Sequence, residues 1–211
     1  MKKTMTLSAA LLSGFILLSS ACAKSVEVEN PEQADNARIY HATVKNVHDG
    51  DTIRVTDSHG REIRIRMAYI DAPELNQAHG QSSRDALRTV LQRQNVQIEI
   101  FDTDQYGRQV ARVLLNGRDV NLQQIRQGNA WHYRSIARRN QNPADYAQYE
   151  RSEAAAKQER AGLWRDRSPV APWTYRQQQR RNEQYRLKKQ PALRKTEGAG
   201  CFSLPAAPCP I

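Results

Sequence analysis

The sequence predicts an α+β domain in which a five-stranded β-barrel is combined with three helices. Five segments between residues 38 and 115 alternate apolar with polar residues, a period typical of strands with one buried face. One segment between the third and fourth strands, and two after the fifth, carry helix signals instead. A chain of 211 residues allows one well-packed domain with appended tails, so a single domain is expected.

The first three strands are predicted from three sets of apolar residues spaced two apart. These sets are Tyr40, Ala42 and Val44, then Ile53 and Val55, then Ile63, Ile65 and Met67. Asp49-Gly50 and His59-Gly60 fall between the sets, and both dipeptides are typical hairpin turns. We therefore expect three consecutive antiparallel strands.

A helix is predicted after Pro73, where the apolar spacing changes. The residues that show the new spacing of three and four are Ala86, Leu87, Val90 and Leu91. Ser82, three residues before Asp85, is a candidate N-cap for this helix.

Two more strands and two more helices follow. The strands alternate at Val96, Ile98 and Ile100, and at Ala111, Val113 and Leu115. The second helix is predicted from Asn121, which with Gln124 resembles a capping pair, to the stop signal at Gly128. The third opens at Pro143 in a stretch rich in helix formers. Five strands with a helix between the third and fourth is the order of an OB-fold, whose open face commonly binds oligonucleotides.

The two ends of the chain lie outside the predicted domain, which spans residues 37–165. Residues 1–22 have a positive start and a short apolar stretch, as an export signal does, and residues 23–36 are a polar, acidic linker. Residues 166–211 form a basic, Pro-containing tail that is expected to be helical only in part. The apolar stretch is too short to span a bilayer, so no transmembrane helix is expected in the mature protein.

The signal allows two interpretations of its cleavage. Residues 18–22 resemble a lipoprotein box whose leucine lies one place too far upstream, which would leave a lipidated Cys22 as a membrane anchor. Ala21-Cys22-Ala23 suits ordinary signal peptidase, which would release a soluble protein. The protein is therefore expected to be exported, either as a periplasmic, outer-membrane or cell-surface lipoprotein or in secreted form. Cys201 and Cys209 form a disulfide or remain unpaired in a Pro-rich tail.

The chain is basic, with 32 Lys and Arg against 22 Asp and Glu and a formal net charge of +10. A positive field of this size attracts polyanions, and nucleic acid is the commonest one because neutralising phosphates releases counterions. Anionic lipid and cell-wall polymer fit the charge equally, so the motifs have to decide between these partners.

Two acidic motifs are candidates for a metal site. Asp49-Gly50-Asp51-Thr52 is consistent with a hairpin turn or with oxygen ligands for a hard cation. Asp71-Ala72-Pro73-Glu74 follows the third predicted strand. Antiparallel hairpins bring the start of the second strand close to the end of the third, so Asp51 and Asp71 are expected to face one ion.

Two arginines complete the predicted site. Phosphodiester cleavage needs a cation, a base that prepares water, and fixed positive charge for the developing negative charge. Arg66 lies on the third strand near Asp71, and Arg108 opens the fifth strand. Guanidinium groups suit bidentate phosphate contacts, which makes two of them beside carboxylates informative.

Three segments together resemble the staphylococcal nuclease family: residues 47–52, 66–74 and 104–108. The similarity extends from Asn36 to Trp164. The resemblance implies that Asp51, Asp71 and the backbone carbonyl of Ala72 bind Ca²⁺, supported by Asp49 and Thr52. It also implies that Glu74 prepares the attacking water and that Arg66 and Arg108 bind the scissile phosphate. Tyr106 would be a wall of the nucleotide pocket.

The activity implied by the resemblance is Ca²⁺-dependent, endonucleolytic hydrolysis of DNA and RNA that leaves 3′-phosphate ends. We expect a monomer and no protein partner. Three positions depart from the family pattern: Ala72 replaces a frequent threonine, Gln105 a lysine, and Arg134 a tyrosine for which Tyr133 is a neighbouring substitute. The alternatives are a catalytically inactive OB-fold nucleic-acid-binding protein of the cell envelope, and an envelope protein that binds sugar or protein.

Overall fold

The structure is a computed structural model that describes residues 38–189. The predicted export signal, the acidic linker and the end of the basic tail with Cys201 and Cys209 lie outside these residues. Within residues 38–189, no helix combines the length and apolar character needed to cross a membrane.

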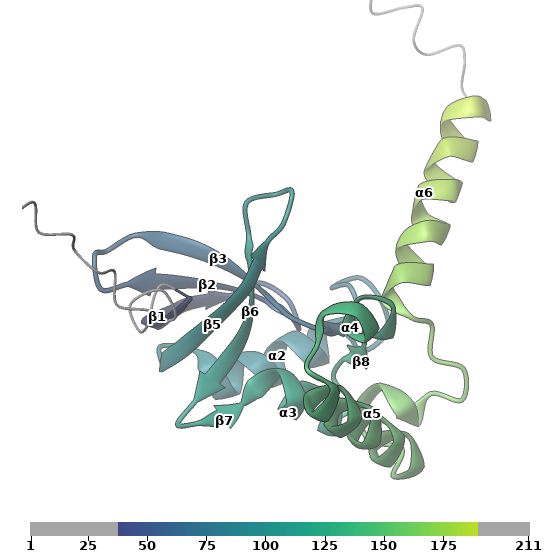
Figure 1. Cartoon of the computed structure of the whole chain (residues 1–211). Helices are drawn as coiled ribbons and strands as arrows, with labels where there is room; N and C mark the ends of the chain where they lie inside the picture. Colours follow the sequence, from purple (N-terminus) through teal and green to yellow (C-terminus); the bar gives the residue numbers. More distant parts are fainter. Residues whose placement is uncertain (1–37, 190–211) are drawn as a thin grey trace, which may run out of the picture.

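Five strands form a closed barrel (Figure 1). They are β1 (Ile39–Val47), β2 (Thr52–Asp57), β3 (Glu62–Met67), β5 (Asn95–Thr103) and β6 (Gln109–Leu115). All neighbours pair antiparallel except β3 and β6, whose parallel pairing closes the barrel. This confirms the predicted five-stranded barrel, because each apolar set places its side chains on the inner face of a strand.

Three two-residue strands were not predicted from the sequence. β7 (Arg118–Asp119) extends the sheet at β6, and β4 (Ile70–Asp71) pairs with β8 (Trp131–His132) in a separate small sheet. Asp71 faces Trp131 in that register. Strands of two residues show no alternation, so only their tertiary partners define them.

The three predicted helices are present, with different caps for two of them. They are α2 (Gly80–Leu91), α3 (Val120–Arg126) and α5 (Pro143–Gln158). α2 begins two residues before the predicted cap Ser82, and its N-cap is His79. α3 is capped by Asp119, whose Oδ1 accepts a hydrogen bond from the amide of Leu122 at 2.9 Å.

The predicted cap of α3 was therefore wrong, because Asn121 and Gln124 are buried and serve other backbone groups. The Asn121 side chain donates to the carbonyls of Ala68 and Ala111, each at 3.1 Å. These bonds tie α3 to the barrel and to the segment that leads into β4.

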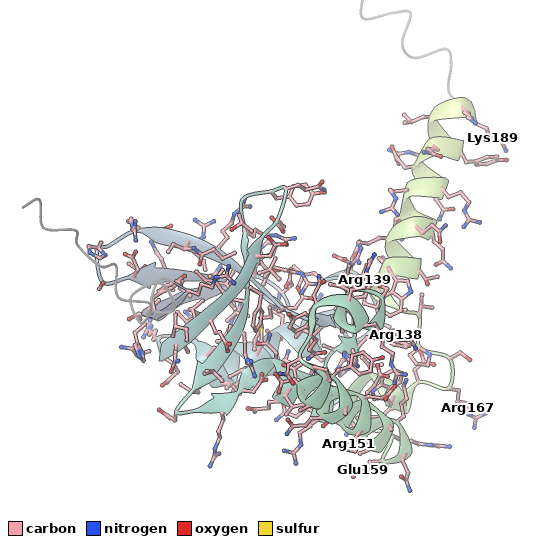
Figure 2. The ribbon with its side chains drawn as sticks, in the orientation of Figure 1. Arg138, Arg139, Arg151, Glu159, Arg167 and Lys189 are labelled. Carbon is pink, nitrogen blue, oxygen red and sulfur yellow. The ribbon has the colours of Figure 1, made fainter. Side chains whose placement is uncertain are left out.

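Further helical elements lie after β8. α4 (Arg134–Asn140) precedes α5, the 3-10 helix η1 (Gly162–Arg165) follows it, and α6 (Pro172–Lys189) extends through the first part of the predicted tail. α6 contacts the domain only at its beginning and then projects away from it (Figure 1), with its side chains spread around the helix (Figure 2).

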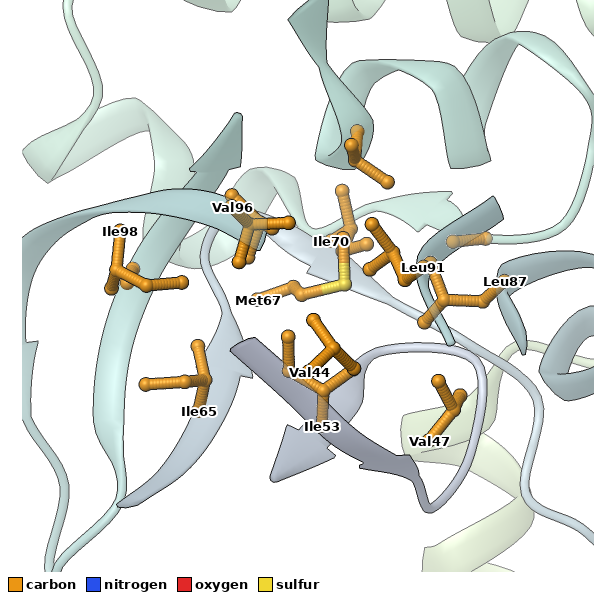
Figure 3. Packing of buried hydrophobic residues seen from close by; sticks show 14 of the residues in the cluster. Val44, Val47, Ile53, Ile65, Met67, Ile70, Leu87, Leu91, Val96 and Ile98 are labelled. Carbon is orange, nitrogen blue, oxygen red and sulfur yellow. The ribbon is translucent and has the colours of Figure 1, made fainter. Parts of the chain in front are cut away.

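The hydrophobic core fills the barrel and the space beneath α2 (Figure 3). Val44, Ile53 and Ile65 point inward from β1, β2 and β3, while Leu87 and Leu91 close one end from α2. Full burial of each such side chain contributes about 1.5 to 3 kcal/mol. A core of this kind fixes the strand ends from which the polar site is built.

Candidate active site

A polar pocket of about 410 Å³ lies where the β1–β2 turn, the segment around β4, the β5–β6 loop and the start of α6 meet. All nine residues singled out from the sequence line this pocket. They are Asp49, Asp51, Thr52, Arg66, Asp71, Ala72, Glu74, Tyr106 and Arg108. Segments as distant as residues 49 and 108 are thus brought together by barrel closure.

Asp51 and Asp71 converge on one guanidinium nitrogen. Nη2 of Arg66 lies 3.0 Å from Oδ1 of Asp71 and 3.2 Å from Oδ2 of Asp51. Only 1% of Asp71 and 5% of Asp51 is exposed. Buried carboxylates need a paired cation, and the Arg66 guanidinium supplies one to both acidic motifs.

The β1–β2 turn fixes the Asp51 carboxylate in place. The hydroxyl of Thr52 donates to Oδ1 at 3.2 Å, and the amide of Ala72 donates to Oδ2 at 2.6 Å. Asp49 accepts a hydrogen bond from the Asp51 amide at 3.0 Å. Asp49 and Thr52 therefore hold the turn and its carboxylate, and the contact with Ala72 links the two acidic motifs.

Gly50 lets this turn approach the helices closely. A Cβ at this position would lie 1.9 Å from Oγ of Ser83 on α2 and 2.6 Å from Cβ of Ala72. The Gly50 carbonyl accepts a hydrogen bond at 2.8 Å from the buried side chain of Gln124 on α3. The Asp-Gly pair thus makes a hairpin and also places Asp51 against α2 and α3.

Burial raises the pKa of Asp51 to about 8. The guanidinium of Arg66 and the amide of Ala72 lower this pKa, while the negative charges of Asp49 and Asp71 raise it. Because burial is the largest of these effects, the carboxyl holds a proton more readily than an exposed aspartate does. A bound cation would have to displace that proton.

The β5–β6 loop holds Arg108 and Tyr106 through one carboxylate. Asp104 accepts hydrogen bonds from the amides of both residues, at 3.0 and 2.9 Å, and from Nε of Arg108 at 2.7 Å. Arg64 donates to the Tyr106 carbonyl at 2.8 Å. The Tyr106 side chain is 64% exposed at the edge of the pocket. The loop thus presents one guanidinium and one aromatic ring to a ligand.

Arg176 of α6 is a pocket residue that sequence reasoning missed. Its Nη2 lies 2.7 Å from Oδ2 of Asp71, and its Nη1 lies 2.8 Å from Oε1 of Glu74. Arg180, one turn later, lines the same pocket. The run of helix formers with Pro172 at its start is a signal for α6 itself, but nothing in the sequence pairs it with residues a hundred positions earlier.

Tyr133 also lines the pocket, whereas its neighbour Arg134 points elsewhere. Arg134 pairs with Glu150 and Glu153 of α5, both at 2.9 Å. Tyr133 stacks on Trp173 of α6 with ring centroids 5.4 Å apart. Tyr133 and Tyr106 are thus the two aromatic residues among those that line the pocket.

The donor atoms around Asp51 fit a hard cation better than a zinc ion. Within residues 38–189, no three His, Cys, Asp or Glu side chains form a metal-binding group. The candidate site offers two carboxylates and the nearby backbone of Ala72, and oxygen donors of this kind suit Ca²⁺. The convergence of both carboxylates on one guanidinium nitrogen shows that a single cation can be reached by both.

Comparisons with known proteins identify relatives of this domain. Residues 64–166 match the family model described as "Staphylococcal nuclease homologue". An "Uncharacterized endonuclease" from Escherichia coli O157:H7 is 38% identical over 138 residues, which cover 64% of this chain and 84% of that protein. A "Micrococcal nuclease" from Shigella flexneri is 34% identical over 169 residues, 76% of this chain and 91% of its own.

A plant relative is matched over a smaller part of its length. The rice "Probable staphylococcal-like nuclease CAN3" (Oryza sativa subsp. japonica) is 37% identical over 124 residues, which are 59% of this chain but only 31% of that protein. The bacterial relatives are matched over most of their length. The chain belongs to the staphylococcal nuclease family.

Proposed function

We propose that the protein is a Ca²⁺-dependent nuclease that hydrolyses phosphodiester bonds of DNA and RNA and leaves 3′-phosphate ends. One observation carries this proposal: five charged side chains from distant segments converge in one pocket. They are Asp51, Arg66, Asp71, Glu74 and Arg108. The pocket thus brings together carboxylates and guanidinium groups, the kinds of side chain that phosphodiester hydrolysis requires.

Asp51, Asp71 and the Ala72 carbonyl would hold Ca²⁺. When bound there, the cation would supply positive charge that polarises the scissile phosphate. The residues around these ligands already restrict them, because the Thr52 hydroxyl and the Ala72 amide each bond to the Asp51 carboxylate. Such support fixes ligand orientation before the cation arrives.

Arg66 and Arg108 would bind the oxygens of the phosphate. Arg66 is mostly buried, and its guanidinium is fixed by the Met67 carbonyl at 2.8 Å and by Asp71 at 3.0 Å. Arg108 is fixed by Asp104. Held in this way, two guanidinium groups stabilise the added negative charge of the five-coordinate transition state with little reorganisation.

Glu74 would accept a proton from the attacking water. The water oxygen then bonds to phosphorus, the bond from phosphorus to the 5′ oxygen breaks, and that oxygen takes a proton from solvent. The upstream fragment keeps the 3′-phosphate. Arg176 donates a hydrogen bond to Oε1 of Glu74 at 2.8 Å, which orients this carboxyl group in the pocket.

The expected site of action is outside the cytoplasm. The export signal predicted in residues 1–22, and a lipid anchor on Cys22 as one form of it, support this part of the proposal. Mass spectrometry of the mature N-terminus distinguishes an acylated Cys22 from cleavage by ordinary signal peptidase.

The proposal is tested by incubating the purified protein with single-stranded DNA or RNA, in Ca²⁺ or in chelator, beside Asp51→Asn. Cleavage is expected only with Ca²⁺ and only with Asp51 intact, and end-group analysis should find 3′-phosphates. Asp85→Asn is the matched control, since Asp85 is an exposed acid on α2 outside the pocket. Equal cleavage by the Asp51 variant, or in chelator, would refute the assignment.

A further inference from the structure

We propose that α6 is a nucleic-acid-binding arm that contacts the phosphate backbone of the substrate strand outside the active-site pocket. The inference rests on the proposed nuclease function and adds a surface to it. It is carried by how α6 is attached, by which residues it places in the pocket, and by the charge of its projecting part.

The start of α6 is fixed to the domain by aromatic contacts. The Trp173 ring lies 5.4 Å from that of Tyr133 and 5.6 Å from that of Trp131, measured between centroids. The hydroxyl of Tyr175 donates to the Asn76 carbonyl at 3.2 Å. Tyr133 also lines the active-site pocket, so the helix begins beside that pocket. It then leaves the domain in one direction (Figure 1).

The first turns of α6 place two positive charges in the pocket. Arg176 bonds to Asp71 and Glu74, and Arg180 lines the pocket on the same helix face, four residues further on. A phosphate chain that reaches the site therefore meets α6 immediately beside the catalytic groups.

The rest of α6 is exposed and strongly basic. The basic residues of the whole helix are Arg176, Arg180, Arg181, Arg186, Lys188 and Lys189. Glu183 is its only acidic residue, and it pairs with Arg186 at 3.0 Å. Within the part of the chain that the structure describes, Arg180, Arg181, Lys188 and Lys189 form no ion pair. Their charge is thus available to an external anion, as at Lys189 near the tip (Figure 2).

Beyond its first turns, α6 is polar and basic on all sides and packs against nothing among the described residues. All side chains from Gln177 to Lys189 are exposed, and no apolar face is present that would bind a second protein. Like charges close together on a helix destabilise it. A polyanion removes that repulsion and gains the free energy of counterion release. At about 1.5 Å per residue the helix is roughly 27 Å long, enough to follow several phosphates.

The test measures binding of the full chain to fluorescent single-stranded DNA in chelator, where cleavage is not expected, over a series of salt concentrations. The variant Arg181→Gln/Lys188→Gln/Lys189→Gln removes three charges outside the pocket. On single strands, each lost phosphate contact reduces the steepness of log affinity against log salt by about 0.7. The salt dependence of the variant should therefore be shallower by about 2. Glutamine keeps the helix propensity, which circular dichroism verifies.

The matched control is Arg118→Gln/Arg126→Gln/Arg151→Gln, which removes three exposed charges from β7, α3 and α5. Its slope should equal that of the unmodified protein. If all three proteins had the same salt slope, or if both variants lost the same amount of slope, the proposal that α6 binds nucleic acid would be refuted. Ca²⁺-dependent cleavage in the same preparations would still support the proposed nuclease function. The proposal would also be refuted if the α6 variant lost binding to anionic vesicles but kept the DNA slope of the unmodified protein. The partner of α6 would then be a membrane surface.

Discussion

The guanidinium of Arg176 bonds to both carboxylate oxygens of Asp71, at 3.2 and 2.7 Å, across 105 residues of sequence. Asp71 also bonds to Arg66, so this buried carboxylate lies between two arginines. Burial lowers the pKa of Arg176, but its bonds to Asp71 and Glu74 outweigh this and leave the pKa above its ordinary value. A permanent positive charge thus faces the oxygens proposed to bind Ca²⁺.

Arg176→Gln should strengthen divalent-cation binding. A cation at Asp71 competes with the guanidinium, and hydrogen bonds to charged groups contribute about 1.5 to 3 kcal/mol, so a Kd lower by about tenfold to a hundredfold is expected. Titration calorimetry with Ca²⁺ measures this directly. Arg180→Gln is the control, because it removes the same charge from the same pocket without a bond to Asp71. Equal tightening in both variants would show that only net charge matters.

The raised pKa of Asp51 predicts how stability depends on pH. Between the ordinary value of 3.8 and about 8, the folded protein keeps a proton that the unfolded chain loses. The free energy of unfolding should therefore fall as pH rises through this range, by at most about 1.4 kcal/mol per pH unit. Urea unfolding in chelator is compared with Asp51→Asn, which cannot titrate. If the free energy of unfolding of the unmodified protein instead rose with pH relative to that of Asp51→Asn, Arg66 and the Ala72 amide would be the stronger influence on the Asp51 carboxyl group.

Arg108→Ala should reduce kcat by about a hundredfold to a thousandfold, the usual effect of removing one transition-state donor. Asp104→Ala should cause a smaller loss, because Arg108 keeps its charge but loses the bonds that orient it. Single-turnover cleavage of a defined oligonucleotide measures both. If Arg108→Ala cleaved at the normal rate, Arg108 would be a surface charge without a role in the reaction.

Gly50→Ala should destabilise the protein by about 1 to 3 kcal/mol or more and weaken cation binding, because its Cβ would collide with Ser83 and Ala72. Gly60→Ala is the control: its φ of +77° strains alanine, but nothing lies within 4 Å of the added Cβ. Its cost should be about 1 to 2 kcal/mol, with normal cation binding. Urea unfolding measures the loss of stability in each variant, and calorimetry measures its cation binding. If both variants bound the cation equally weakly, the close fit at Gly50 would be contradicted.

The sequence was sufficient for the barrel and for most of the site. Strand periodicity is local, so Val44, Ile53 and Ile65 mark their strands without reference to the rest of the fold. The two acidic motifs flank β2 and β3, one at the start of β2 and one after the end of β3. Because these strands are consecutive and antiparallel, Asp51 and Asp71 were expected to meet. Arg108 was included because a guanidinium at the opening of a strand suits phosphate contact, and the family resemblance then implied its role.

Other features could not be predicted because they depend on contacts between distant segments. Asn121 was expected to cap α3, yet barrel closure buries it between Ala68 and Ala111. β4 and β8 are too short to show a period and exist only as each other's partners. The raised pKa of Asp51 follows from burial, which a motif does not specify.

The sequence by itself determined the five barrel strands, three of the helices, their order and the residue types of the site, because these follow from local spacing and side-chain chemistry. Only the tertiary structure decided that α6 begins at the active site and that Arg176 binds Asp71 and Glu74. That contact depends on the direction in which the chain returns after η1, and the aromatic packing of Trp173 on Trp131 and Tyr133 fixes this direction.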